Sequence, residues 1–436
     1  MSKKAKPTTN QITGYTFIKK AAGVEEYELK TNGLRVLYFS RPKTGVVTTN
    51  ITYKVGARDE ARGETGVAHM LEHMLFKPTK ADVKKGIADG RAMKFERETG
   101  SVLNANTWKD RTTYYFSYPT KYYDEALAIE AERMTGVFLS DEVLKPEQGN
   151  VLSEFDMYNG DPSFALSTAM CTAAFQSHPY GHETIGFRED IEDYTADKLD
   201  RFYKNYYRPD NATMMVVGDI ERNEALDKVR KYFKDIKNPA TPIPRFSIRE
   251  PKQEGLRRTR VCRESTTNIL SLGFKYGSFP QKKWFTAVLM SEVLTSGPDS
   301  ILDKLLIDTG KASAVSFFPE PLSETTLATI NIYLAKDEEH SEIESLTLKA
   351  IKALRTKHIS SLVSKTKEAI LTSEIISRDS SQAIAAELTE YVSAGDWSVY
   401  ADTIKIIDSI TAKDVIDMIQ ESFVDENMTI GEFIGN

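Results

Sequence analysis

The chain has 436 residues, a length that fits two domains of roughly 200 residues each. Hydrophobic residues make up 40% and charged residues 28%, a composition that excludes a disordered chain and predicts a folded globular protein. The net charge of −6, with no concentrated basic stretch in the body of the chain, argues against nucleic acid as a partner, and the absence of a run of about 18 apolar residues argues against a membrane span.

The first 26 residues read as a polar leader, because their lysines are not followed by an apolar run of signal-peptide length. We therefore expect a cytoplasmic protein. The two cysteines, Cys171 and Cys262, lack C-x-x-C spacing. Two buried free thiols are the favoured interpretation, and one long-range disulfide is the alternative.

Strands and helices alternate through residues 27–236, which we expect to form the first domain. An Asn-Gly turn between residues 27–29 and 34–39 predicts a hairpin. Period-two or β-rich runs predict strands, and apolar residues at helical spacing predict helices. The further strands are expected at 46–55, 112–118 and 213–220, and the helices at 65–77, 121–138, 145–158, 163–175, 195–205 and 222–235.

Periodicity stops between residues 237 and 256, where four of the 16 prolines fall, and this segment is the predicted linker. Residues 257–436 then repeat the order of the first part. Strands are expected at 268–275, 327–334 and 428–433, and helices at 285–294, 300–308, 341–356, 360–377 and 380–395. The predicted fold is α+β, with two tandem similar domains that each pack helices on one face of a mostly antiparallel sheet.

The candidate chemistry centres on His69, Glu72 and His73, in the order H-x-x-E-H. Histidines at i and i+4 lie one helical turn apart on the same face, so both imidazoles can reach one Zn²⁺. Glu72 projects beside them and can take the proton of a water molecule at that metal. Histidines that merely cap or pack a helix are the alternative.

A third ligand has to come from another segment. Glu147 and Glu154 lie seven residues apart on one face of the helix predicted at 145–158. One carboxylate can bind the metal while the other orients a histidine, and taken alone both could equally be solvated surface acids.

Inverted H-x-x-E-H followed about 80 residues later by E-x₆-E resembles the inverzincin peptidases of the pitrilysin and insulinase type. The segments LNANTWKDRTTYYFSY and PEQGNVLSEFDM are similar to family segments in the same order, and the short two-domain form resembles mitochondrial processing peptidase subunits and bacterial homologues. The resemblance implies one Zn²⁺ per chain, Glu154 as its third ligand, Glu147 as the supporting carboxylate and Glu72 as the catalytic base. Extra residues at 80–98 account for a longer separation between the motif and Glu154 than is common in the family.

Substrate-binding candidates also follow from the resemblance. Residues 103–107 resemble the family's edge strand, on which a peptide is held by backbone hydrogen bonds, so Asn104 and Ala105 are candidates. Without the resemblance, the Asn-Ala-Asn run favours a turn. Phe76 could line a pocket, although core packing is commoner at its spacing, and Tyr180 is a further candidate.

The segment HPYGH also has i, i+4 histidines, His178 and His182, but Pro179 and Gly181 between them favour a loop without a metal.

The second half lacks features that the family often places there. The expected helix at 285–294 has no histidine, residues 300–302 read Ser-Ile-Leu where relatives have an Arg, and residues 312–314 read Ala-Ser-Ala where relatives have a Tyr. We therefore expect a dimer and favour a heterodimer with a subunit that supplies this Arg and Tyr, with a homodimer as the alternative. The predicted function is a zinc endopeptidase acting on peptides or unfolded segments. The alternatives are a structural subunit of the same fold and a zinc hydrolase with an unrelated substrate.

Overall fold

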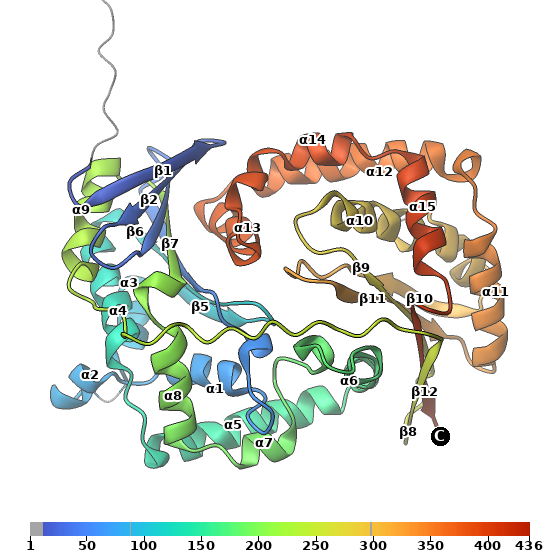
Figure 1. Cartoon of the computed structure of the whole chain (residues 1–436), viewed down its shortest axis with the longest axis horizontal. Coiled ribbons are helices and arrows are strands. Elements are labelled where there is room, and N and C mark those ends of the chain that lie inside the picture. The colour runs from blue at the N-terminus through green and yellow to red at the C-terminus, as the bar shows by residue number, and fades with distance from the viewer. Residues whose placement is uncertain (1–11, 88, 297–298) are drawn as a thin grey trace, which may run out of the picture.

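The computed structural model describes residues 12–87, 89–296 and 299–436 and consists of two halves, each built on one sheet (Figure 1). Residues 1–11 of the predicted leader lie outside this description. The rest of that prediction is wrong, because residues 15–26 form strand β1 and the start of β2. Lysines obscure the period-two pattern of β1, in which Tyr15 is buried and Phe17 packs against Tyr27 at a centroid distance of 5.5 Å.

The first sheet has the order β1-β2-β3-β7-β4-β6-β5. Neighbouring strands are antiparallel except β3 and β7, which run parallel. The predicted hairpin is confirmed as β2 and β3, and β5 is an edge strand in place of the turn that local propensity favoured. The strands are β1 (Tyr15–Ala21), β2 (Val24–Leu29), β3 (Arg35–Ser40), β4 (Val46–Tyr53), β5 (Val102–Thr107), β6 (Thr112–Pro119) and β7 (Ala212–Gly218).

The helices of the first half include each one predicted, together with short ones that were not. The stretch 80–98 contains α2 and most of α3, and α5 begins at Asp141, so Pro146 lies inside the helix instead of near its start. The helices are α1 (Val67–Met74), α2 (Lys80–Lys84), α3 (Arg91–Thr99), α4 (Tyr123–Gly136), α5 (Asp141–Asn159), α6 (Pro162–Ala174), α7 (Arg188–Glu192), α8 (Ala196–Tyr206) and α9 (Arg222–Phe233).

The second half has a sheet of order β10-β11-β9-β12-β8, with β8 (Arg257–Arg263), β9 (Ile269–Tyr276), β10 (Ala312–Phe317), β11 (Thr326–Leu334) and β12 (Met428–Gly435). Its helices are α10 (Lys282–Thr295), α11 (His340–Lys352), α12 (Thr356–Ser377), α13 (Ser381–Ala394), α14 (Thr403–Asp408) and α15 (Ala412–Ser422). The helix expected at 300–308 contains a π-helical turn, Asp303–Ile307.

The two halves share one topology, which supports the predicted duplication. The order β3-β7-β4-β6-β5 in the first sheet corresponds strand by strand to the order β8-β12-β9-β11-β10 in the second. The orientations also agree, because β3–β7 and β8–β12 are the parallel pairs and the other equivalent pairs are antiparallel. Helix α10 in the second half therefore takes the place of α1 in the first.

Each half also places one helix on the sheet of the other half. Helix α13 packs on β4 and β7, and α6 packs on β8, β9 and β12 (Figure 1). Strand β7 is buried on both faces, since Met214 and Val216 lie in the core of the first half while Met215 and Val217 join that of the second.

Residues 237–256 form the predicted linker without a helix or strand, and this segment runs across the molecule between the halves.

Both cysteines are free thiols, as predicted. Cys171 is buried, but Cys262 is exposed, so the expectation of burial is wrong for Cys262, which lies on the edge strand β8. None of the helices in the described part of the chain is long and apolar enough to cross a membrane.

Candidate metal centre

Helix α1 holds the H-x-x-E-H motif between the core and an open face. Five of its residues are buried, whereas His69, Glu72 and His73 are only partly buried on the other side. The helix starts at Gly66, whose φ of 83° lies in the left-handed region and whose hypothetical Cβ would lie 2.2 Å from the carbonyl oxygen of Ile185. Glycine is therefore required at this position on both counts.

A buried carboxylate caps the same helix. Glu60 accepts hydrogen bonds from the backbone N–H groups of Gly66 (2.8 Å, to Oε2) and Ala68 (2.9 Å, to Oε1), and His182 Nε2 lies 3.1 Å from Oε2. A carboxylate at a helix N-terminus satisfies unpaired donors and interacts favourably with the helix dipole. His182 thus supports the motif helix through its contact with Glu60.

Helix α5 brings the two predicted glutamates to α1. Val151, midway between them, is fully buried and anchors the shared face, with Glu147 largely buried and Glu154 one-quarter exposed. The spacing of seven residues therefore directs both carboxylates toward the motif.

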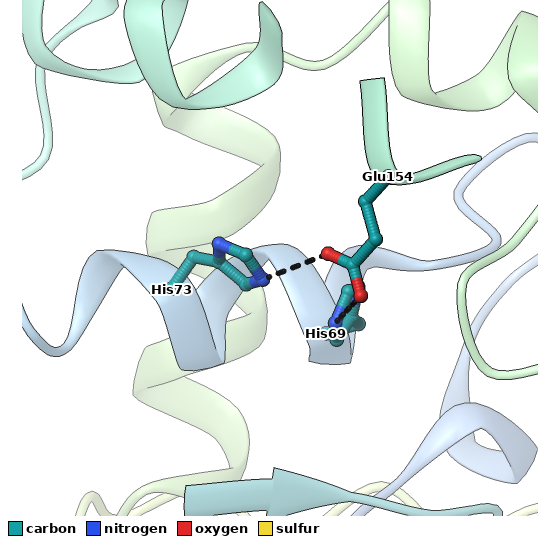
Figure 2. A group of neighbouring side chains, drawn as sticks. All are labelled: His69, His73 and Glu154. Carbon is teal, nitrogen blue, oxygen red and sulfur yellow. Dashed lines mark ion pairs between the residues drawn. The ribbon is translucent and has the colours of Figure 1, made fainter. Parts of the chain in front are cut away.

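His69, His73 and Glu154 converge on one point (Figure 2). Glu154 lies 3.9 Å from His69 Nε2 through one carboxylate oxygen and 3.5 Å from His73 Nε2 through the other. The three ligand atoms lie within 4.8 Å of one another, and this is the one such group of His, Cys, Asp or Glu side chains found across residues 12–87, 89–296 and 299–436. Two imidazole nitrogens and a carboxylate oxygen are a donor set that suits a catalytic zinc ion, so the residues present fit the metal.

Glu147 orients His73. Its Oε1 lies 3.1 Å from His73 Nδ1, which leaves Nε2 directed toward Glu154, and its other oxygen is paired with Lys77 and accepts from Asn150 at 3.2 Å. The supporting role predicted for Glu147 matches this arrangement, because the hydrogen bond to one ring nitrogen determines which nitrogen can bind a metal.

The electrostatics of the group differ between its two histidines. Burial, and then the charge of His73, lowers the pKa of His69 to about 4, so this imidazole is neutral at pH 7. For His73 burial acts in the same direction, but hydrogen bonds to Glu147 and Glu154 outweigh it and raise the pKa to about 9. The hydrogen bond from His73 in turn lowers the pKa of Glu147 to about 2. To hold a metal ion through Nε2, His73 would have to give up this proton.

Glu72 lies beside this group without joining it. Its Oε2 accepts a hydrogen bond of 2.5 Å from Thr107 Oγ1 on β5. Burial raises the pKa of its carboxyl group, and the bond from Thr107 opposes the shift. A raised pKa brings a glutamate closer to the range in which a general base works at neutral pH.

The predicted substrate residues fall into different environments. Asn104 and Ala105 lie on the edge strand β5, where Asn104 Oδ1 accepts from the Ala105 N–H at 2.8 Å. Phe76 is partly buried against the core, with its ring 6.3 Å from that of Tyr114. Tyr180 is fully buried and donates to Asp110 at 2.6 Å, so its predicted contact with substrate is wrong for this conformation.

The segment HPYGH forms a 3-10 turn, Pro179–Gly181, as its Pro and Gly predict, and its two histidines face different carboxylates. His178 Nε2 lies 2.8 Å from Glu324 of the second half.

Sequence reasoning missed several side chains that support the site. Lys77 lies four residues after His73, a spacing that could have indicated it, and Tyr158 lies four residues after Glu154, where burial and then the charge of Glu154 raise the pKa of its hydroxyl group. Thr107 and Glu60 have no comparable signal, because they reach α1 only through the tertiary structure.

The comparisons with known proteins agree with this geometry. Residues 35–187 match the family described as Insulinase (Peptidase family M16), and residues 193–370 match the one described as Peptidase M16 inactive domain. The chain belongs to the peptidase M16 family. The histidine motif lies within the match to the insulinase family. The match to the inactive domain covers α10, which has no histidine.

Relatives within the M16 family include bacterial and mitochondrial proteins. "Zinc protease PqqE" of Helicobacter pylori is 34% identical over 292 residues, which cover 66% of this chain and 64% of that protein, slightly less than two thirds. "Probable mitochondrial-processing peptidase subunit beta" of Schizosaccharomyces pombe is 24% identical over 92% of this chain and 89% of its own length. A crystal structure of a protease from Helicobacter pylori has a TM-score of 0.88 at 26% identity, covering 95% of this chain and all of that one.

Proposed function

We propose that this M16 chain is a zinc-dependent endopeptidase that hydrolyses peptides or unfolded segments. The observation that carries the proposal is the convergence of His69, His73 and Glu154 on one point, with Glu72 on the same turn of α1. Zinc proteases among the relatives support the metal and the chemistry.

The roles of the residues follow from their positions. His69, His73 and Glu154 would hold one Zn²⁺, which when bound polarises a scissile carbonyl group and lowers the pKa of a water molecule. Glu72 accepts the proton of the attacking water and passes it to the leaving amine. Edge strand β5, with Asn104 and Ala105, pairs with β6 on one side only, so the backbone of an extended peptide could pair with its other side regardless of sequence once the Ala105 N–H leaves Asn104 Oδ1.

The proposal extends to assembly and location. Residues 300–302 and 312–314 lack the Arg and Tyr of many relatives, which supports a heterodimer whose second subunit provides them, with a homodimer as the alternative. The free thiols of Cys171 and Cys262 support a reducing, cytoplasmic location.

Replacement of Glu72 by Gln tests the peptidase proposal. The variant keeps the size and hydrogen-bonding capacity of the side chain but cannot take a proton, so we expect one zinc per chain by metal analysis and a 10²- to 10⁴-fold lower rate on a quenched fluorogenic peptide. A chelator should abolish the wild-type activity and added zinc should restore it.

A structural subunit of the same fold gives a different result. In that case the wild type, alone or with its natural partner, does not cleave peptides, and Glu72→Gln leaves assembly unchanged. Cleavage by Glu72→Gln at the wild-type rate would refute the role of the carboxylate.

A further inference from the structure

Thr107 is the last residue of β5, and its side chain reaches across to the motif helix. Leu103 and Ala105 point into the core, and Thr107 lies on the same face two residues further along the strand. Its Oγ1 lies 2.5 Å from Glu72 Oε2. Because an ionised carboxylate has no proton to donate, Thr107 is the donor in the state in which Glu72 acts as a base.

This bond fixes the end of the Glu72 side chain in one orientation. A glutamate has three side-chain torsions, and holding it in one orientation costs conformational entropy unless a contact defines that orientation. Within the described ranges of the chain, no other side chain donates a hydrogen bond to Glu72. With Oε2 bound to Thr107, the second oxygen, Oε1, stays available to accept a proton.

The backbone at Thr107 is held by contacts with β6, with the turn that follows and with Arg111. It pairs with Thr112 in the β5–β6 register, and the turn that follows is closed by Trp108 N–H donating to the carbonyl of Arg111 at 2.8 Å. Arg111 is 6% exposed, bonds to Asn106 of β5 and forms a two-point ion pair with Glu390 of α13. The end of β5 is therefore held from both halves of the molecule.

We propose that Thr107 is a positioning residue for Glu72, and that β5 thereby fixes the base relative to the strand edge on which a peptide binds. The inference deepens the proposed peptidase function and rests on it. Strand β5 would both orient the substrate and hold the carboxylate of Glu72 through Thr107. The hydrogen bond from Thr107 therefore fixes the distance between the base and the substrate. A misplacement of a reacting group by about 1 Å can cost about 100-fold in rate.

Three variants separate positioning from structural support. Thr107→Val keeps the shape and removes the hydroxyl group, and Thr107→Ser keeps the hydroxyl group. Thr112→Val is the matched control, because it removes a buried hydroxyl group from the directly opposed residue, one that donates to the carbonyl of Val55 at 3.0 Å and does not contact Glu72. Each protein is assayed for kcat and KM on the fluorogenic peptide, for zinc content and for thermal unfolding.

We expect Thr107→Val to lower kcat about 10- to 100-fold with KM within about twofold and zinc content unchanged. Thr107→Ser should stay within about threefold of wild type, and Thr112→Val should keep its kcat. A crystal structure of the metal-free Thr107→Val protein should show Glu72 in a changed or divided rotamer, a readout that does not require activity of the isolated chain.

The inference is overturned if Thr107→Val keeps the wild-type kcat while Glu72→Gln is inactive, if Thr107→Ser loses as much as Thr107→Val, or if Glu72 keeps its rotamer in Thr107→Val. Failure of the proposed function looks different, since Glu72→Gln then equals the wild type.

Discussion

A buried ion pair on α4 predicts a pH-dependent stability of definite sign. Glu130 and Arg133 are each 2% exposed, with Glu130 Oε1 3.2 Å from Arg133 Nη2, and both carboxylate oxygens lack a hydrogen bond. The guanidinium group lies 4.9 Å from the ring centroid of Tyr114 and 5.0 Å from that of Phe116. Burial raises the pKa of Glu130 from 4.5 to about 7, although Arg133 opposes the shift.

Because the folded chain holds this proton more tightly than the unfolded chain, the stabilisation from protonated Glu130 is full below pH 4.5 and is lost as the pH rises through about 7. The separation of the two pKa values corresponds to about 3 kcal/mol, of which about 2.5 kcal/mol is lost between pH 5 and pH 8. Replacement of Glu130 by Gln removes this titration while leaving an amide of similar size.

The free energy of unfolding should be measured by urea titration at pH 5 and pH 8 for the wild type and Glu130→Gln. Relative to wild type, the variant should gain about 2.5 kcal/mol at pH 8 over its value at pH 5. Glu125→Gln, on the exposed side of the same helix, serves as the control and should show no such difference. A stability difference between Glu130→Gln and wild type that is equal at both pH values would refute the reasoning.

Three further predictions concern the site and its supports. Glu147→Gln should weaken zinc binding about 10- to 100-fold, measured by competition with a chelator, because the amide no longer holds His73 by a charged hydrogen bond; unchanged affinity would contradict this. Gly66→Ala should lower the free energy of unfolding by at least about 2 kcal/mol and reduce zinc content, since the methyl group collides with a backbone carbonyl at a left-handed φ. Glu390→Gln should cost about 3 kcal/mol in urea unfolding by leaving Arg111 buried without its charged partner, and a loss below about 0.5 kcal/mol would show that the pair contributes little.

Local periodicity was sufficient for most of the fold. The long helices carry apolar residues at helical spacing, the central strands are continuous β-rich runs that are buried on both faces, and the Asn-Gly turn predicted the β2–β3 hairpin. Patterns failed where tertiary contacts override composition. The lysines of β1 remain at the surface of a sheet, and the Asn-Ala-Asn run becomes a strand because β6 supplies its hydrogen-bond partners.

The metal group was predictable because its geometry is local to two helices. The spacing of His69 and His73 on α1, and of Glu147 and Glu154 on α5, already defines which faces they share. The packing of α1 against α5 and β5 is not encoded in such spacing. Nor does local spacing show that Tyr180 is buried, since it lies in one hydrophobic cluster with Ile269 and Phe433 of the second half.

The exchange of α6 and α13 between the sheets makes the two halves depend on each other for folding. A fragment ending before residue 237 would leave Met215 and Val217 on β7 facing water, because the helix that covers them comes from the other end of the chain. Proteolytic cleavage within 237–256 should accordingly yield two pieces that co-elute and unfold together. The stability of the metal group in the first half should therefore depend on residues of α13, more than 200 positions away in the sequence.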